Sequence, residues 1–158
     1  VLLGRYPHSK YSIKDSFSDI QTTQNILEEL KLNELRDREL DTLSGGELQK
    51  VGIALLLAQD PELFLLDEPI NHLDIAFAAQ LKTILKERVS KRSASLLLAT
   101  HDINYVNEFC DSLILMLGDG NLILGKTQEV LTEKNLSEAF SCKISKFSNG
   151  ISTIFHSV

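Results

Sequence analysis

A short apolar run that ends in two acids constrains this chain more than any other stretch. Leu63–Leu66 is continuously apolar and too short for a helix, so it predicts a strand buried on both faces. Asp67 and Glu68 follow directly, which places them at the carboxyl end of a strand, where open α/β sheets bind ligands. There Asp67 can hold a hydrated divalent cation and Glu68 can handle a proton or water. An acidic turn closed by Pro69 is the plainer interpretation.

Composition and charge narrow the class of protein. The 158 residues are 43% hydrophobic and 24% charged, which is typical of one globular domain, and no apolar run has the length of a membrane span or the form of a secretory signal. A net charge of −6 without a basic block argues against an electrostatic nucleic-acid platform. Cys110 and Cys142 lack metal-ligand spacing, so free thiols are expected.

Helical spacing occurs twice before the strand and once after the acids. Gln21 and Glu47 stand three positions after serines, which is the spacing of a capping box. Val1–Leu3 could end a strand or a helix, and Gly4–Ser12 is expected to be a loop because Pro7 breaks any period. The predicted helices run from Ser18 to about Leu30, from Ser44 to about Ala58 and from Ile75 to about Val89. The side chains expected on the buried faces of the first two are Ile20, Ile26, Leu27 and Leu30, and Leu48, Val51, Leu55 and Ala58.

Further strands are expected in the second half of the chain. Leu96–Ala99 predicts a second buried strand and Leu113–Leu117 a third, with Asp102 capping a helix between them, so a parallel sheet with right-handed crossovers is predicted. His101 is then expected at the same sheet edge as the two acids. Asp119–Gly120 predicts a hairpin turn. The remaining predictions are short helices at Thr127–Leu131 and Asn135–Phe140 and a closing hairpin of Lys143–Phe147 with Gly150–Phe155.

Gly120–Thr127 reads GNLILGKT and matches the phosphate-loop pattern GxxxxGK[ST]. A phosphate loop curls its backbone N–H groups around the anion, which asks for small or permissive residues between the glycines. Leu122, Ile123 and Leu124 favour an extended backbone instead. We therefore interpret this stretch as the return strand of a hairpin.

Four motifs in a fixed order carry a family resemblance. Ser44–Glu47 has capping-box spacing, but its two glycines are not needed for a cap and suit a helix start that approaches an anion. LSGGE at Leu43–Glu47, LLDEP at Leu65–Pro69, NHLD at Asn71–Asp74 and THD at Thr100–Asp102 resemble the signature, Walker B, D-loop and switch histidine of ABC-type ATPases. More narrowly, VLLGRYPH, LSGGELQKV, LLLAQDP and HDINYV resemble importers of ferric siderophores, haem or cobalamin.

The resemblance implies an α/β fold of the P-loop NTPase type, the ABC nucleotide-binding domain. Residues 1–60 would form a helical subdomain with the signature, and residues 61–158 the catalytic core from Walker B onward, with a parallel sheet and C-terminal hairpins. In the family, the true phosphate loop precedes the segment that resembles Val1–Leu3. We therefore expect these 158 residues to be the C-terminal portion of such a domain and to be inactive alone.

The resemblance also implies a role for individual residues of the site. The resemblance implies that Glu68 is the general base, that His101 contacts the γ-phosphate and that Asp67 holds Mg²⁺ through its water shell. The ATP would be held by a second copy of the subunit, since two domains of this family pair head to tail. The positions expected to bind that nucleotide or line the seam are Ser44, Gly45, Gly46, Glu47 and Asp74.

The family also implies partners and a location. We expect a cytoplasmic ATPase subunit, peripheral on the cytoplasmic face of the cell membrane through permease subunits, with no nucleic acid and no direct membrane insertion. A soluble ABC ATPase of translation or DNA repair is an alternative, and so is a catalytically dead remnant that only binds a partner. A serine hydrolase using Ser44, Asp67 and His101 is rejected, because Thr42 stands where the nucleophile elbow needs glycine.

Overall fold

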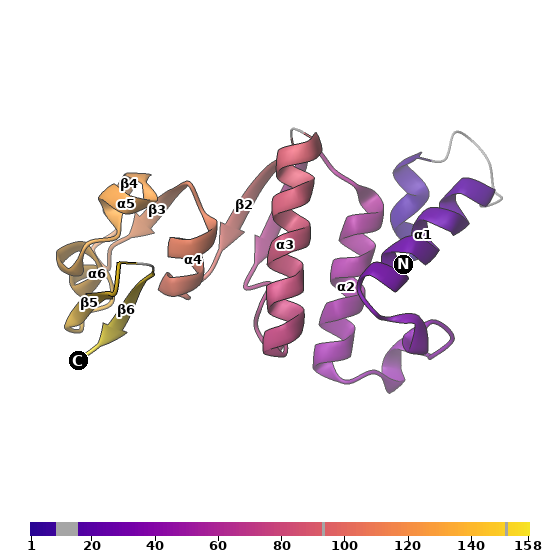
Figure 1. The fold of residues 1–158 in the computed structure, drawn as a ribbon, viewed down its shortest axis with the longest axis horizontal. Coiled ribbons are helices and arrows are strands. Elements are labelled where there is room, and N and C mark those ends of the chain that lie inside the picture. Colours follow the sequence, from indigo (N-terminus) through magenta and orange to yellow (C-terminus); the bar gives the residue numbers. More distant parts are fainter. Residues whose placement is uncertain (9–15, 93, 151) are drawn as a thin grey trace. The chain divides into compact units, whose positions relative to one another are not determined.

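The computed structural model describes residues 1–8, 16–92, 94–150 and 152–158. They form two compact units, Val1–Ala99 and Thr100–Val158 (Figure 1). The division expected at residue 60 concerns functional parts of the domain and stays a prediction. Among the described residues, no helix combines the length and the apolarity needed to cross a membrane.

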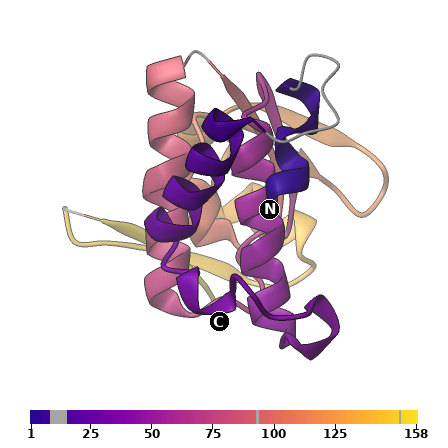
Figure 2. The same ribbon diagram turned by 90° about the vertical axis from the view of Figure 1, so that its right-hand side faces the viewer.

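The first unit is mainly helical. Helix α1 packs against α2, and the two lie side by side in both views (Figure 1 and Figure 2). The elements are the 3-10 helix η1 (Leu2–His8), α1 (Phe17–Glu29), the 3-10 turns η2 (Asn33–Leu35) and η3 (Leu40–Thr42), α2 (Gly45–Gln59), strand β1 (Leu63–Asp67), α3 (Ile75–Arg92) and strand β2 (Ser95–Ala99).

Helix η1 occupies part of the stretch that we predicted to be a loop. Gly4 permits a close approach to α2, because a Cβ on it would lie 2.5 Å from the Leu55 carbonyl oxygen. Arg5 donates to the Ala58 carbonyl at 3.0 Å and to the Asp19 carboxylate at 2.9 Å. These tertiary contacts hold residues 4–8 in helical form. The loop prediction was based on Pro7 and its sequence neighbours, so it could not include them. The remainder of the predicted loop, 9–12, lies outside the described residues.

Helix α1 begins earlier than the sequence suggested. Ser16, and not Ser18, is its cap: the Ser16 hydroxyl accepts from the Asp19 N–H at 3.1 Å and donates to the Asp19 carboxylate at 2.6 Å. The predicted apolar face is confirmed at Ile26, Leu27 and Leu30, which are buried. The prediction was wrong for Ile20, which is 45% exposed.

Helix α2 confirms the predicted start at Ser44 and carries a complete capping box. It ends at Gln59, and the residue that caps its C-terminus, Asp60, has a φ of 47° in the left-handed region. Among the positions predicted for its buried face, only Ala58 is fully buried. Leu48 is 49% exposed, whereas the buried side chains are those of Ile53, Ala54, Leu57 and Ala58. Apolar residues surround much of this helix, so spacing alone could not select the face that packs.

Strands β1 and β2 pair in parallel, from Leu63 opposite Ser95 to Asp67 opposite Ala99. Phe64 is 1% exposed, but Leu65 is 63% and Leu97 59% exposed on the alternate positions. The prediction of a strand buried on both faces was therefore wrong, since only one face is covered. The strand itself, and its end at the first acid, are confirmed.

The second unit consists of short elements around a small apolar core. The side chains of Leu131, Leu136, Ile144 and Phe155 form that core. Asp102 caps α4 as predicted. The elements are α4 (Ile103–Phe109), β3 (Ser112–Met116), β4 (Leu122–Lys126), α5 (Thr127–Val130), α6 (Glu133–Ala139), β5 (Ile144–Ser148) and β6 (Thr153–Ser157).

Both predicted hairpins form. Strand β3 runs antiparallel to β4 through a turn in which Gly120 has φ of 86°, and β5 pairs antiparallel with β6. Leu122–Lys126 is strand, which confirms that Gly120–Thr127 is not a phosphate loop. Strand β3 lies in the second unit, whereas β1 and β2 lie in the first, so the expectation that Leu113–Leu117 extends the parallel sheet stays a prediction.

Candidate functional site

The start of α2 places Ser44 at an exposed position with its polar atoms engaged by Glu47. The Ser44 N–H donates to Glu47 Oε2 at 2.8 Å, and the Ser44 hydroxyl donates to the same oxygen at 2.7 Å. The Glu47 N–H donates back to the Ser44 hydroxyl at 3.3 Å. The hydrogen bonds from the Ser44 hydroxyl and N–H lower the pKa of the Glu47 carboxyl below its usual range. Glu47 is therefore a carboxylate at neutral pH and sets the direction of the Ser44 hydroxyl.

The two glycines that follow have different surroundings. A Cβ on Gly45 would meet no atom within 4 Å, whereas a Cβ on Gly46 would lie 3.0 Å from the His72 carbonyl oxygen. Gly46 thus allows α2 to approach the loop after the acids, and Gly45 leaves its backbone open to solvent. The first N–H groups of a helix have no partner within the helix, and with the helix dipole they attract anions. The open side at Gly45 suits such an anion.

The two acids differ in exposure and backbone. Asp67 is the last residue of β1 and is exposed, while Glu68 is partly buried. The Glu68 N–H donates to the Ala99 carbonyl at 2.9 Å, which ties it to β2. Its φ of 45° is left-handed, a conformation that is uncommon for residues other than glycine and is enriched at functional sites.

A magnesium ion fits Asp67 as a single oxygen ligand. Mg²⁺ usually binds proteins through one or two carboxylates and takes its other ligands from water and substrate phosphates. Within residues 1–8, 16–92, 94–150 and 152–158, no group of three or more His, Cys, Asp or Glu side chains could hold a metal by itself. An exposed carboxylate at the end of β1 agrees with an ion that arrives with a nucleotide.

The loop after the acids is fastened to the start of α2. Lys50 donates to the Asp74 carboxylate at 2.6 Å and lies 4.7 Å from the centre of the Phe77 ring. Asp74 also accepts from the Phe77 N–H at 2.8 Å, and Gln49 donates to the Pro69 carbonyl at 3.4 Å. The bond from Lys50, and next that from the Phe77 N–H, lower the pKa of the Asp74 carboxyl. The start of α2 and the loop that ends at Asp74 thus form one packed surface.

Within the first unit, the structure brings several of the predicted site residues together. Ser44, Glu47 and Asp74 lie on elements that contact each other in the first unit. His101 is exposed and belongs to the second unit, just before the cap of α4. The expectation that it lies beside Asp67 and Glu68 stays a prediction.

Sequence reasoning missed two cations that hold the predicted residues. Lys50 holds Asp74, and Arg38 donates to Glu47 Oε1 at 3.1 Å and to the Thr42 carbonyl at 2.9 Å. Neither partner could be found from a periodic pattern, because the contacts cross from one element to another. The only signal available was a basic residue close to each motif.

Comparison with known proteins gives consistent matches. The pattern of the family described as ABC transporter matches residues 6–71. An uncharacterised ABC transporter ATP-binding protein of Methanocaldococcus jannaschii is 36% identical over 140 residues, which is 89% of this chain and 54% of that protein. A petrobactin import ATP-binding protein of Bacillus anthracis is 31% identical over 147 residues, 92% of this chain and 54% of that protein.

Solved structures agree. An inward-facing conformation of a putative metal-chelate type ABC transporter matches with a TM-score of 0.80 at 30% identity, over 99% of this chain and 63% of that chain. A dimeric ATP-binding cassette in a post-hydrolysis state, bound to ADP and phosphate, matches with a TM-score of 0.66 at 26% identity, over 80% of this chain and 53% of that chain. This chain spans about half the length of the curated relatives it matches. The chain therefore belongs to the ABC transporter family and has the fold of its nucleotide-binding domain, an α/β P-loop NTPase.

Proposed function

We propose that this chain is part of the ATP-binding subunit of an importer that couples ATP hydrolysis to the uptake of an iron complex, haem or a cobalamin-type substrate. One observation carries the proposal: the open helix start at Ser44 is packed, through Lys50 and Asp74, against the loop that follows the two acids. The names of the relatives, which include a petrobactin importer and a metal-chelate transporter, support the iron-complex class of cargo.

The chemistry assigned to the acids is the polarisation of water against a phosphoryl group. Glu68, whose position is fixed by its hydrogen bond to Ala99, would act as general base toward the attacking water. His101 would contact the γ-phosphate. Magnesium, when bound with the nucleotide, would neutralise phosphate charge, and Asp67 would hold it.

The signature residues would act on a second copy of the subunit. Ser44, with the N–H groups of Gly45 and Gly46, would bind the γ-phosphate of ATP held by that copy, and Glu47 would orient the serine. Asp74 would lie in the seam between copies. The dimeric cassette among the similar structures supports pairing with a second copy. The pair would sit on the cytoplasmic face of the membrane against membrane-spanning permease subunits.

The deciding assay is ATP hydrolysis with magnesium by the longest natural chain that contains this segment. Glu68→Gln should abolish turnover, because the amide cannot accept a proton from water. Glu62→Gln is the matched control, since that exposed glutamate directly precedes the opposite end of β1 and should leave turnover unchanged. Full turnover in Glu68→Gln would refute the assignment of the base. The 158-residue piece alone should be inactive.

The cargo is tested in cells. A chromosomal Glu68→Gln change should abolish the uptake of one among a labelled ferric siderophore, haem and cobalamin, and that molecule is the cargo. Normal uptake of all three by a strain whose purified enzyme has lost turnover would refute the importer class while leaving the ATPase assignment standing.

A further inference from the structure

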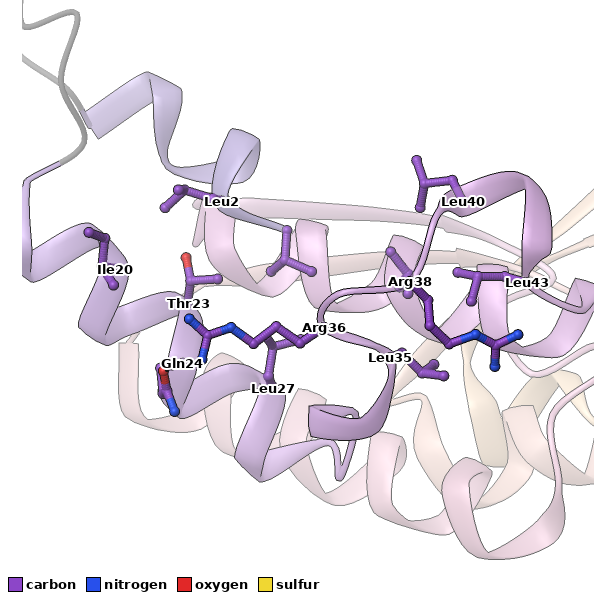
Figure 3. A pocket seen from close by; sticks show the side chains of 12 residues that line it. Leu2, Ile20, Thr23, Gln24, Leu27, Leu35, Arg36, Arg38, Leu40 and Leu43 are labelled. Atoms are coloured by element: carbon purple, nitrogen blue, oxygen red, sulfur yellow. Dashed lines mark hydrogen bonds between the residues drawn. The ribbon is translucent and has the colours of Figure 1, made fainter.

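A pocket of about 260 Å³ lies in the helical part of the first unit (Figure 3). Its lining is largely aliphatic and includes Leu43, which immediately precedes Ser44, and Leu40, which lies four positions before that serine. Two arginines, Arg36 and Arg38, also line it. One wall of this pocket is therefore the segment that leads into Ser44.

Arg38 reaches from this wall to the signature. Its Nη1 donates to Glu47 Oε1 at 3.1 Å and its Nη2 to the Thr42 carbonyl at 2.9 Å. The guanidinium is planar and its donors keep a fixed spacing, so the two bonds together fix where the Glu47 carboxylate lies relative to the chain before Ser44.

Glu47 links Arg38 to Ser44 through its two carboxylate oxygens. The two carboxylate oxygens share one plane, so holding Oε1 on Arg38 directs Oε2 toward Ser44. Oε2 accepts both the Ser44 N–H and the Ser44 hydroxyl. The direction of that hydroxyl therefore depends on a residue nine positions away from Glu47 in sequence.

Arg36 provides an internal comparison. It lines the same pocket, but its Nη1 donates to the Gln24 side chain on α1 at 3.3 Å. Arg36 and Arg38 thus share charge, size and location, and their hydrogen bonds lead to different elements. If only the positive charge beside the pocket mattered, replacing either arginine would have the same effect on Ser44.

We propose that Arg38 is a positioning residue for the signature serine, acting through Glu47 and joining the wall of the pocket to Ser44. Its effect on turnover rests on the proposed function, since it requires that Ser44 bind nucleotide. The Arg38 and Glu47 side chains are 44% and 32% exposed, so solvent screens the pair and its contribution to overall stability is small. The consequence of removing Arg38 is local to Ser44.

Hydrogen exchange tests the geometry without any nucleotide. In the longest natural chain that contains this segment, Arg38→Gln should speed exchange of the Ser44 amide about fivefold, because its acceptor loses its anchor. Arg36→Gln should leave that rate unchanged, and amides within α3 should keep their protection in both variants. An unchanged Ser44 rate in Arg38→Gln, or a loss of α3 protection along with it, would overturn the proposal.

Turnover separates positioning from a merely structural role. Arg38→Gln should lower kcat for ATP about fivefold with KM within twofold, and should have no further effect in a Ser44→Ala background. Independent, multiplying losses in the double variant would overturn the proposal. If the natural chain hydrolyses no ATP, the proposed function fails, and the exchange experiment still decides the role of Arg38.

Discussion

Alanine at the two signature glycines should separate packing from ligand contact. A Cβ on Gly46 would lie 3.0 Å from the His72 carbonyl oxygen, which is backbone and cannot rotate away. His72 itself has φ of 63°, so its loop has little freedom to shift. At Gly45 the Cβ would meet nothing within 4 Å. The two positions are adjacent in the first turn of α2, so the gain in helix propensity from Gly to Ala is similar at both.

The difference between the two variants therefore isolates the clash. Crowding a packed position costs about 1 to 3 kcal/mol, and we expect Gly46→Ala to have a free energy of unfolding about 1 to 2 kcal/mol lower than that of Gly45→Ala. Urea denaturation of both variants at one temperature measures this difference. In the longest natural chain that contains this segment, Gly45→Ala should nevertheless lower ATP turnover. The added methyl group would occupy the open side of the helix start, where an anion would approach.

Two outcomes would refute this reasoning. Equal unfolding free energies would show that the contact between Gly46 and the His72 carbonyl does not constrain α2. Wild-type turnover in Gly45→Ala would show that the open side of the helix start does not meet the nucleotide.

Two further predictions concern stability. Phe64→Ala should lower the free energy of unfolding by about 3 to 5 kcal/mol in urea, because Phe64 is 1% exposed and its removal leaves a cavity; a loss below about 1 kcal/mol would contradict its place in the core. The Ser16 hydroxyl, and next Arg5, hold the pKa of the buried Asp19 carboxyl below its usual range. The ionised Asp19 carboxylate stabilises the fold above its unfolded pKa of about 3.9, and this stabilisation is lost as pH falls through the lower pKa of the folded state. Below about pH 4, the urea midpoint should therefore fall more steeply with pH in wild type than in Asp19→Asn. Parallel pH profiles of the two proteins would contradict this.

Local rules predicted many element boundaries correctly. The capping box at Ser44 depends on residues three apart, and the Asp119–Gly120 turn depends on two neighbours, so a short stretch contains all the information. The same holds for the strand at Leu63–Asp67, which a short apolar run followed by an acid predicted. The rejection of a phosphate loop at Gly120–Thr127 also used only the preferences of the residues between its glycines.

The start of α1 was predicted wrongly because two nearby serines could each cap the helix. Ser16 and Ser18 both suit a helix start, and the spacing to Gln21 favoured the second. The structure selects Ser16 because Asp19 accepts its hydroxyl while pairing with Arg5, which lies on η1. A partner 14 positions away in sequence thus decided a helix boundary.

The sequence by itself determined the order of the motifs, the family and the places where most elements begin and end, because each depends on neighbouring residues. The tertiary structure alone decided which faces are buried and what surrounds the motifs. Leu65 is exposed although it lies in an apolar run, and Leu48 is exposed although it has the spacing of a buried helix face. The contacts of Lys50 with Asp74 and of Arg38 with Glu47 join separate elements, and their distances follow from packing, which no local pattern contains.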